Sequence, residues 1–196
     1  MTRVGVVGGG PAGLSAALFA SKNGLDVVLF DTDDTWMNKA HLFNYLGIGS
    51  VGGEAFMRTA RQQVDDFGVD RHQGEAVTDV ASGDDGFTIT TDDDEYDADY
   101  LVLATGADRD LAAALGCETT DEGVVDVGVE METSVADAYA TGAMVRAEEW
   151  QAVISAGDGA AAALNILSKE KGEHYHDFDV PADATETFGS MVDEST

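Results

Sequence analysis

Apolar positions near the start of the chain form two short, unbroken runs on either side of a Gly-rich turn. The runs are residues 4–7 (VGVV) and 27–30 (VVLF). Continuous runs of this length predict strands that are buried on both faces, as in a parallel sheet. Between them, residues 12–22 are rich in Ala and Leu and end shortly before Gly24, which predicts a helix. The pattern therefore predicts a strand–turn–helix–strand unit.

The spacing of apolar residues changes in the middle of the chain. Phe56, Ala60, Val64 and Phe67 recur at helical spacing, which predicts an amphipathic helix. Short alternating segments separated by acidic turns then predict a small antiparallel β-meander. These segments are residues 75–82, 86–91 and 95–100. Further strands are predicted at 100–106, 123–132 and 136–142, and one long helix at 147–172.

The order of these elements predicts an α/β fold: a Rossmann-type parallel sheet with flanking helices and a small antiparallel β-meander. A chain of 196 residues is a natural length for one domain. We expect a single domain of this type to span residues 1–172. Residues 173–196 are predicted to form an acidic C-terminal tail.

The turn after the first strand carries the first sign of chemistry. Gly8, Gly10 and Gly13 fit the pattern G-x-G-x-x-G. Gly8 is expected to make the tight turn, Gly10 to let a pyrophosphate approach the backbone, and Gly13 to let the helix pack closely. The N-terminus of that helix offers unpaired N–H groups to phosphate oxygens. A Gly-rich turn that only packs a helix is the alternative interpretation.

An acidic residue closes the second strand. Asp31 follows the glycines by about twenty residues, which is the spacing expected for a carboxylate that accepts ribose hydroxyls. Thr32 and two further aspartates follow it, without a neighbouring Arg or Lys to meet a 2′-phosphate. NADP is therefore an unfavourable ligand for this site.

The chain is strongly acidic, which disfavours negatively charged partners. The chain has 38 acidic and 10 basic residues, for a formal net charge of −28. Nucleic acid and anionic membrane surfaces are disfavoured, because both require a positive face. The acids are spread along the chain, which resembles the hydrated surface of halophilic proteins. At molar salt the Debye length is only about 3 Å, so their mutual repulsion is screened.

Segments that would direct or anchor the chain are not predicted. No run is long and apolar enough to span a bilayer, and the N-terminus enters a strand without a cleavable signal. A single cysteine, Cys117, excludes an internal disulfide framework. We therefore expect a cytoplasmic protein without a membrane partner.

Four stretches together resemble the FAD-binding domain of the thioredoxin reductase-like pyridine nucleotide-disulfide oxidoreductases. Residues 4–20 resemble the FAD pyrophosphate loop, and residues 42–68 the segment that passes the flavin ring. Residues 101–107 (LVLATGA) resemble the second nucleotide-binding turn, and 133–164 the C-terminal flavin segment. The match covers most of residues 3–168 and implies FAD as the cofactor.

The resemblance implies a set of cofactor-binding residues, and the catalytic residues remain unknown. Gln151, Ala152 and Val153 would face the isoalloxazine ring. Trp36, His41, Tyr45 and Trp150 are candidates for packing near it. The complete predicted cofactor set is Gly8, Gly10, Pro11, Ala12, Gly13, Asp31, Thr32, Asn44, Val77, Ala104, Thr105, Gly106, Gly142, Ala143, Met144, Gln151, Ala152 and Val153.

The chain also departs from that family in three ways. Ala143 stands where the family has an aspartate that holds the ribityl chain of the flavin. The family's inserted NADPH domain is replaced by a short connection after residue 107, and its Cys-x-x-Cys is absent. Cys117 lies in that connection and is expected to be an inert, partly buried thiol.

Two other patterns receive structural interpretations. Gly157, Gly159 and Ala162 fit G-x-G-x-x-A, but no strand and closing acid follow, so we expect these small residues to let this helix pack close to a ligand and to the first helix. His174 and His176 could face one side of a strand as metal ligands. Because no cysteine or third histidine lies nearby, we predict no metal site.

Three classes of function remain. The first is a small FAD-dependent oxidoreductase that exchanges electrons with a separate, unidentified donor or acceptor. The second is an NAD-binding single-Rossmann protein, and the third is a non-catalytic nucleotide-binding regulatory module. The C-terminal flavin segment favours the first class, and a homodimer is retained as an option.

Overall fold

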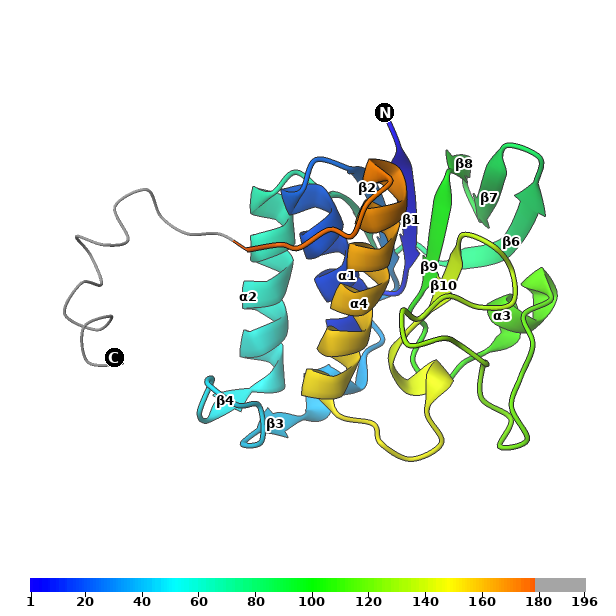
Figure 1. Cartoon of the computed structure of the whole chain (residues 1–196). Helices are drawn as coiled ribbons and strands as arrows, with labels where there is room; N and C mark the ends of the chain where they lie inside the picture. Colours follow the sequence, from blue (N-terminus) through cyan, green and yellow to red (C-terminus); the bar gives the residue numbers. More distant parts are fainter. Residues whose placement is uncertain (179–196) are drawn as a thin grey trace, which may run out of the picture.

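The computed structural model describes residues 1–178, and a five-stranded parallel sheet forms its centre (Figure 1). The strand order is β10-β9-β1-β2-β5. The strands are β1 (Arg3–Val7), β2 (Asp26–Asp31), β5 (Asp70–Gln73), β9 (Tyr100–Leu103) and β10 (Ala138–Ala140). All four pairings between neighbouring strands are parallel, which confirms the predicted Rossmann-type sheet.

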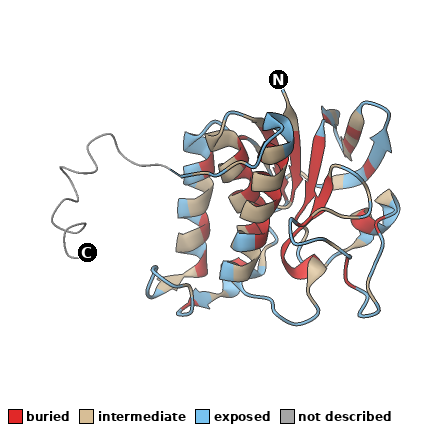
Figure 2. Cartoon of the chain, viewed as in Figure 1, coloured by how far each residue is buried: buried red, intermediate tan, exposed pale blue. Residues whose placement is uncertain are grey.

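Three helices cover one face of this sheet (Figure 1). They are α1 (Pro11–Lys22), α2 (Gly53–Asp66) and α4 (Ala152–Lys171). Figure 2 shows the buried residues gathered on the strands and on the helix surfaces that face them. Ala16, Ala17 and Ala20 of α1 are fully buried, because their small side chains let α1 lie between the sheet and its neighbouring helices.

The opposite face of the sheet is covered by the predicted β-meander. It consists of the antiparallel strands β6 (Val77–Gly83), β7 (Gly86–Thr91) and β8 (Glu95–Ala98). A short helix, α3 (Asp110–Leu115), lies beside β6. Phe87 and Ile89 of the meander form a second buried cluster with Phe30, Leu101 and Leu103 of the sheet. The sheet therefore separates two apolar cores.

Several predicted boundaries are wrong. Residues 123–132 form no strand; they make isolated bridges only, at Val125 and Glu132, because Gly123 and Met131 have positive φ and turn the chain. The long helix begins at Ala152 instead of 147, since Gln151 before it is extended. The third meander strand ends at Ala98, and Asp99 separates it from β9. Neither β5 nor α3 is predicted by the sequence pattern.

The remaining described elements are short. They are η1 (Trp36–Lys39), β3 (His41–Leu42), β4 (Val51–Gly52) and η2 (Gly142–Val145). The predicted tail is described only through residue 178, and its remainder, 179–196, lies outside the described residues. His174 and His176 lie in an irregular segment with their ring centroids 6.5 Å apart, not on a strand. None of the helices in the described part of the chain has the length and apolar character of a membrane span.

Candidate functional site: the carboxyl edge of the sheet

Most of the predicted cofactor residues follow the carboxyl ends of four neighbouring parallel strands. Gly8 follows β1, Asp31 ends β2, Ala104 follows β9, and Gly142 lies just beyond β10. Because the strands are parallel, these ends meet at one edge of the sheet, which is where open α/β sheets bind ligands. A Cβ atom at Gly8 would lie 2.3 Å from the carbonyl oxygen of Ala104, so the first and second turns are in direct contact.

The Gly-rich turn is tightly packed at three of its positions and open at the fourth. Gly8 has a φ of +110°, which only glycine adopts readily. A Cβ at Gly13 would lie 1.8 Å from the carbonyl oxygen of Gly8, so α1 starts directly against the turn. At Gly9, which sequence reasoning did not single out, a Cβ would lie 2.2 Å from the Asp31 carboxylate. Among the described atoms, the nearest to a Cβ at Gly10 is the Thr35 Oγ1 at 3.8 Å.

Two helix N-termini also reach this edge. Within the described residues, no side chain caps α1 or α4, whose N-cap residues are Gly10 and Gln151. The first N–H groups of a helix have no partner inside the helix and carry a partial positive charge. A Cβ at Gly142 would lie 3.2 Å from the Cβ of Ala12, so η2 also contacts the first turn of α1. These groups form a cradle that is suited to an anion such as a pyrophosphate.

Asp31 is buried against the turn and carries two contacts. One carboxylate oxygen accepts the N–H of Asp33 at 2.8 Å. The other lies 3.1 Å from an Nη2 of Arg61, which comes from α2 and also bonds Asp33. The three residues that follow Asp31 include no Arg or Lys, but the fold brings Arg61 to it from α2. A carboxylate has four acceptor positions, so Asp31 can still accept ribose hydroxyls.

Arg109 is a second cation that sequence reasoning missed at this edge. It lies just after the ATGA turn, and its Nε donates to the carbonyl oxygen of Met144 at 2.9 Å. Its Nη2 donates to the carbonyl oxygen of Ala143 at 3.3 Å. The connection after β9 is thus fastened to the segment that resembles the family's flavin segment. Arg109 lies two residues after the ATGA turn, and this position is the signal in the sequence that could have indicated its contact with the flavin segment.

An ion pair joins the end of η2 to α4. Arg146 donates from Nε and Nη2 to the two oxygens of Asp158, at 3.1 and 2.6 Å. Asp158 is buried, and its carboxylate raises the pKa of the Arg146 guanidinium. This bidentate pair holds the connection that places Gln151 at the start of α4.

Some of the residues predicted near the flavin ring meet one another, and others lie apart from them. Asn44 donates from Nδ2 to the Oε1 of Gln151 at 2.7 Å, so these two predicted residues meet. The rings of Trp36 and Trp150 also meet, with centroids 5.2 Å apart. Tyr45 instead lines a cavity between α1 and α2.

The other ring candidates and predicted cofactor residues are more scattered. His41 stacks on Phe43, with ring centroids 4.5 Å apart. Ala152 and Val153 begin α4, directly after Gln151. Val77 starts β6 and packs with the core on the meander side of the sheet, while Thr32 is exposed.

Reactive groups are scarce in this region. Cys117 is buried after α3, and burial raises the pKa of its thiol, which disfavours the reactive thiolate form. Its Sγ lies 3.6 Å from the Oγ1 of Thr133. Among residues 1–178, no group of three His, Cys, Asp or Glu side chains is arranged to hold a metal ion. The groups at this edge have the chemistry that suits an anion and ribose hydroxyls.

Comparison with known proteins supports the same assignment of fold. The family model "Pyridine nucleotide-disulphide oxidoreductase" matches residues 2–52 and 47–159. The thioredoxin reductase of Listeria monocytogenes is 31% identical over 123 residues, which cover 61% of this chain and 38% of that protein. The dihydrolipoyl dehydrogenase of Haloferax volcanii is 28% identical over 178 residues, covering 85% of this chain and 34% of that protein.

The structural comparison agrees with the sequence comparison. The crystal structure of T. acidophilum thioredoxin reductase matches with a TM-score of 0.80 and 16% identity, covering 87% of this chain and 100% of that chain. At this identity the likeness shows the fold alone. The chain spans little more than a third of the length of the two curated relatives named above.

Proposed function

This chain belongs to the pyridine nucleotide-disulphide oxidoreductase family, and on that premise we propose that it binds FAD at the carboxyl edge of its sheet and exchanges electrons with a separate partner. The observation that carries the proposal is the opening at Gly10. It is the one glycine of the turn where an added Cβ would meet no described neighbour closer than 3.8 Å, and it lies at the uncapped N-terminus of α1.

Each part of FAD has a matching group at this edge. The pyrophosphate would lie over Gly10 and accept hydrogen bonds from the first turn of α1. The adenosine ribose would donate its hydroxyls to Asp31, whose charge is balanced by Arg61. The flavin half would extend toward η2 and the start of α4, where Asn44 meets Gln151. When bound, the flavin supplies a ring that accepts and donates electrons.

A separate partner is proposed because two parts of the family that the chain resembles are missing here: the inserted NADPH domain and the Cys-x-x-Cys. Between β9 and β10 the described chain runs through residues 104–137, which contain α3 and no second nucleotide-binding fold. The single cysteine, Cys117, is buried and cannot form a dithiol pair. We therefore expect NADPH alone to reduce the bound flavin slowly, since residues 1–178 contain no second nucleotide-binding fold to position it.

The decisive experiment replaces Gly10 by valine and measures FAD binding to the apoprotein in molar salt. A Cβ at Gly10 meets only the Thr35 Oγ1, at 3.8 Å, so the fold should tolerate the change. Gly83→Val is the matched control: its Cβ would meet only the Gly86 carbonyl oxygen, at 3.9 Å, and it lies in β6 away from the proposed site. We expect Gly10→Val to lose FAD and Gly83→Val to retain it, with similar thermal unfolding for both.

A parent protein that binds no FAD would overturn the proposal. Gly10→Val with unchanged affinity would mean that the pyrophosphate lies elsewhere. The titration should include NAD, because a buried Asp31 can accept the ribose hydroxyls of either dinucleotide. Binding of NAD without FAD would support the alternative of an NAD-binding protein. Rapid reduction of bound FAD by NADPH alone would contradict the need for a separate partner.

A further inference from the structure

The two tryptophans of the chain form one exposed group beside the carboxyl edge of the sheet. Trp36 lies in η1 and Trp150 lies two residues before α4, yet their ring centroids are 5.2 Å apart. Trp36 is 59% exposed and Trp150 is 42% exposed. The Nε1 of Trp150 donates to the carbonyl oxygen of Arg146 at 2.9 Å, which fixes this ring. Exposed aromatic rings that are held in place often anchor protein interfaces, so the tryptophan pair indicates an interaction site.

The tryptophan pair is joined to both ends of the proposed FAD site. Trp150 directly precedes Gln151, which belongs to the proposed flavin end. Trp36 directly follows Thr35, whose Oγ1 lies 3.8 Å from the position of a Cβ at Gly10. A protein bound on the tryptophan pair would therefore lie next to the bound cofactor.

We propose that the tryptophan pair is the docking surface for the separate electron-carrying protein, whose contact face has an apolar centre and a rim of Lys and Arg. This inference rests on the proposed FAD site, because the docked protein exchanges electrons with that cofactor. The two indole rings require an apolar centre on the partner, and the charges around them require a basic rim. Within three residues of either tryptophan, the chain has four exposed acids and one exposed base: Asp33, Asp34, Glu148, Glu149 and Lys39.

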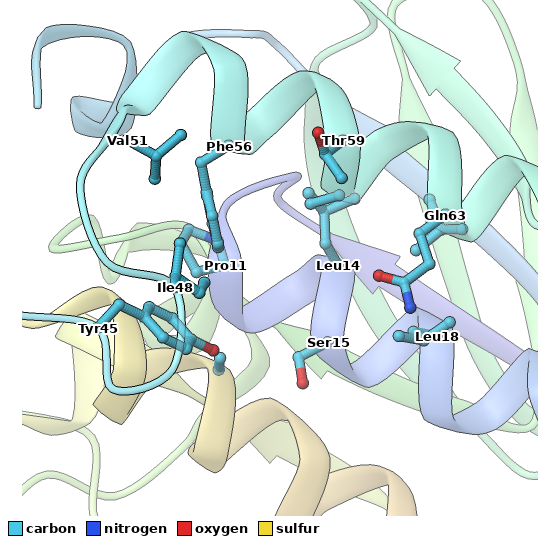
Figure 3. A pocket seen from close by; sticks show the side chains of 13 residues that line it. Pro11, Leu14, Ser15, Leu18, Tyr45, Ile48, Val51, Phe56, Thr59 and Gln63 are labelled. Atoms are coloured by element: carbon cyan, nitrogen blue, oxygen red, sulfur yellow. The ribbon is translucent and has the colours of Figure 1, made fainter. Parts of the chain in front are cut away.

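The shape of this surface favours a protein over a small molecule. The two rings contact each other, so a flat molecule cannot be inserted between them and would be held from one side only. The cavity between α1 and α2, of about 410 Å³, is a separate feature that Leu14, Tyr45 and Phe56 line and neither tryptophan does (Figure 3). An anionic membrane would be repelled by the net charge of −28.

Salt weakens the electrostatic part of this recognition and leaves the apolar part. At molar salt the Debye length is about 3 Å, so charges attract only in direct contact and do not steer a distant partner. Burial of the indole rings involves no charge and is not screened. We therefore expect the tryptophans to supply most of the affinity and the acidic rim to select the partner.

The first test measures binding of ferrocytochrome c, a basic electron-carrying protein, to the isotope-labelled full chain by NMR in about 0.5 M salt. Because the chain has two tryptophans, its two indole N–H signals both report on this surface. We expect both signals to shift saturably in the parent. Trp36→Ala should raise the dissociation constant roughly thirtyfold, as for an aromatic interface anchor, with the remaining Trp150 signal as the readout.

Phe67→Ala is the matched control for loss of an exposed ring. Phe67 is 45% exposed after α2, and its carbonyl oxygen accepts from Ser21 near the C-terminal end of α1, away from the proposed site. We expect this variant to bind ferrocytochrome c as the parent does. No saturable shift in the parent would overturn the proposal, as would equal weakening by Trp36→Ala and Phe67→Ala.

A second pair of variants separates docking at this surface from general attraction to an acidic chain. Glu148→Gln removes one charge of the rim, and Asp84→Asn removes one from the exposed turn between β6 and β7. Glu148→Gln should weaken binding about threefold and Asp84→Asn should leave it unchanged. Equal effects of the two substitutions would show attraction without a defined surface and would overturn the proposal.

The last measurement connects docking to electron exchange. Two molecules of ferricytochrome c take up the two electrons of one reduced flavin, and one proton is released. The photoreduced, FAD-loaded parent and Phe67→Ala should carry out this reaction faster than Trp36→Ala, and equal rates would overturn the proposal. Indole shifts measured on the apoprotein do not need FAD, so they separate failure of this docking surface from failure of the proposed FAD site.

Discussion

Gly159 of α4 lies against the carbonyl oxygen of Ala12 in α1, so closely that a Cβ at position 159 would be 2.0 Å from that oxygen. This contact sets the distance between the two helices whose N-termini reach the carboxyl edge of the sheet. Gly159 therefore serves close packing on α1, as the sequence predicts, whereas no described atom lies within 4 Å of a Cβ at Gly157. Neither helix can be moved outward without separating the two halves of the proposed FAD site.

The first prediction is that Gly159→Ala destabilises the fold and weakens FAD binding. The added methyl must push α4 away from α1, and overpacking of this kind costs about 1–3 kcal/mol. Gly157→Ala is the matched control in the same helix, because no described atom lies within 4 Å of its Cβ position. The control should be up to about 1 kcal/mol more stable than the parent, since alanine favours a helix. Denaturant unfolding in molar salt measures both, and equal stability of the two variants would contradict the packing role.

The second prediction concerns the position where the family has an aspartate. We expect Ala143→Asp to tighten FAD binding, because a charged acceptor for a ribityl hydroxyl adds about 1.5–3 kcal/mol, or tenfold to a hundredfold in affinity. The guanidinium of Arg109, which donates to the carbonyl oxygen of Ala143, reduces the repulsion between the new carboxylate and the pyrophosphate. Equilibrium titration of the apoprotein with FAD checks the change.

Ala143→Asn serves as its control. The amide oxygen has the same reach without the charge, so its gain in affinity should be smaller. If Ala143→Asp binds FAD no better than the parent, position 143 does not lie at the ribityl chain.

The third prediction tests the pairing of Asp31 with Arg61. The carboxylate of Asp31 is 4% exposed and the side chain of Arg61 17%, so the pair is largely removed from water. We expect Arg61→Met to lower the free energy of unfolding by about 2–3 kcal/mol, because it leaves a buried carboxylate without its cation. Arg58→Met, on the exposed side of the same helix, should change it by less than about 0.5 kcal/mol.

A double-mutant cycle separates this pairing from a general effect of removing Arg61. Asp31→Asn removes the charge that Arg61 balances, so adding Arg61→Met to that variant should cost much less than in the parent. Additive costs in the double mutant would show that Arg61 stabilises the fold by other contacts.

The fourth prediction is a loss of stability at alkaline pH that depends on Tyr139. Burial raises the pKa of Tyr139 to about 12. Its hydroxyl donates to the Oδ1 of Asn165 at 2.7 Å, which it can do only while protonated. An unfolded tyrosine ionises near pH 10, so the unfolded chain loses its proton first as the pH rises. The stabilising effect is therefore complete below about pH 10 and is lost between about pH 10 and 12.

Tyr139→Phe should make the free energy of unfolding depend less on pH between about pH 10 and 12. We expect the variant to be about 1 kcal/mol less stable than the parent at about pH 9, because the hydrogen bond to Asn165 is lost. The difference should shrink or reverse at about pH 11. Tyr100, whose pKa is also raised by burial, keeps some alkaline sensitivity in both proteins. Urea unfolding at the two pH values checks this, and parallel profiles would contradict it.

The sequence by itself determined the first half of the sheet, the Gly-rich turn and the family. These features depend on neighbours along the chain: a continuous apolar run indicates a buried strand, and the turn after β1 needs Gly8 at a positive φ. The same local logic placed the predicted nucleotide-binding residues, because carboxyl ends of parallel strands share one edge. Whether those residues bind FAD stays a prediction.

Only the tertiary structure decided which distant groups meet at that edge. The polar strand β5 has no apolar pattern of its own and forms because it pairs with β2. Residues 123–132 look like a strand but turn instead, because strand pairing needs a partner edge as well as apolar side chains. Arg61 reaches Asp31 across 30 residues, and Arg109 reaches Ala143 across 34. Such contacts follow from how helices and connections pack on the sheet, which no local pattern encodes.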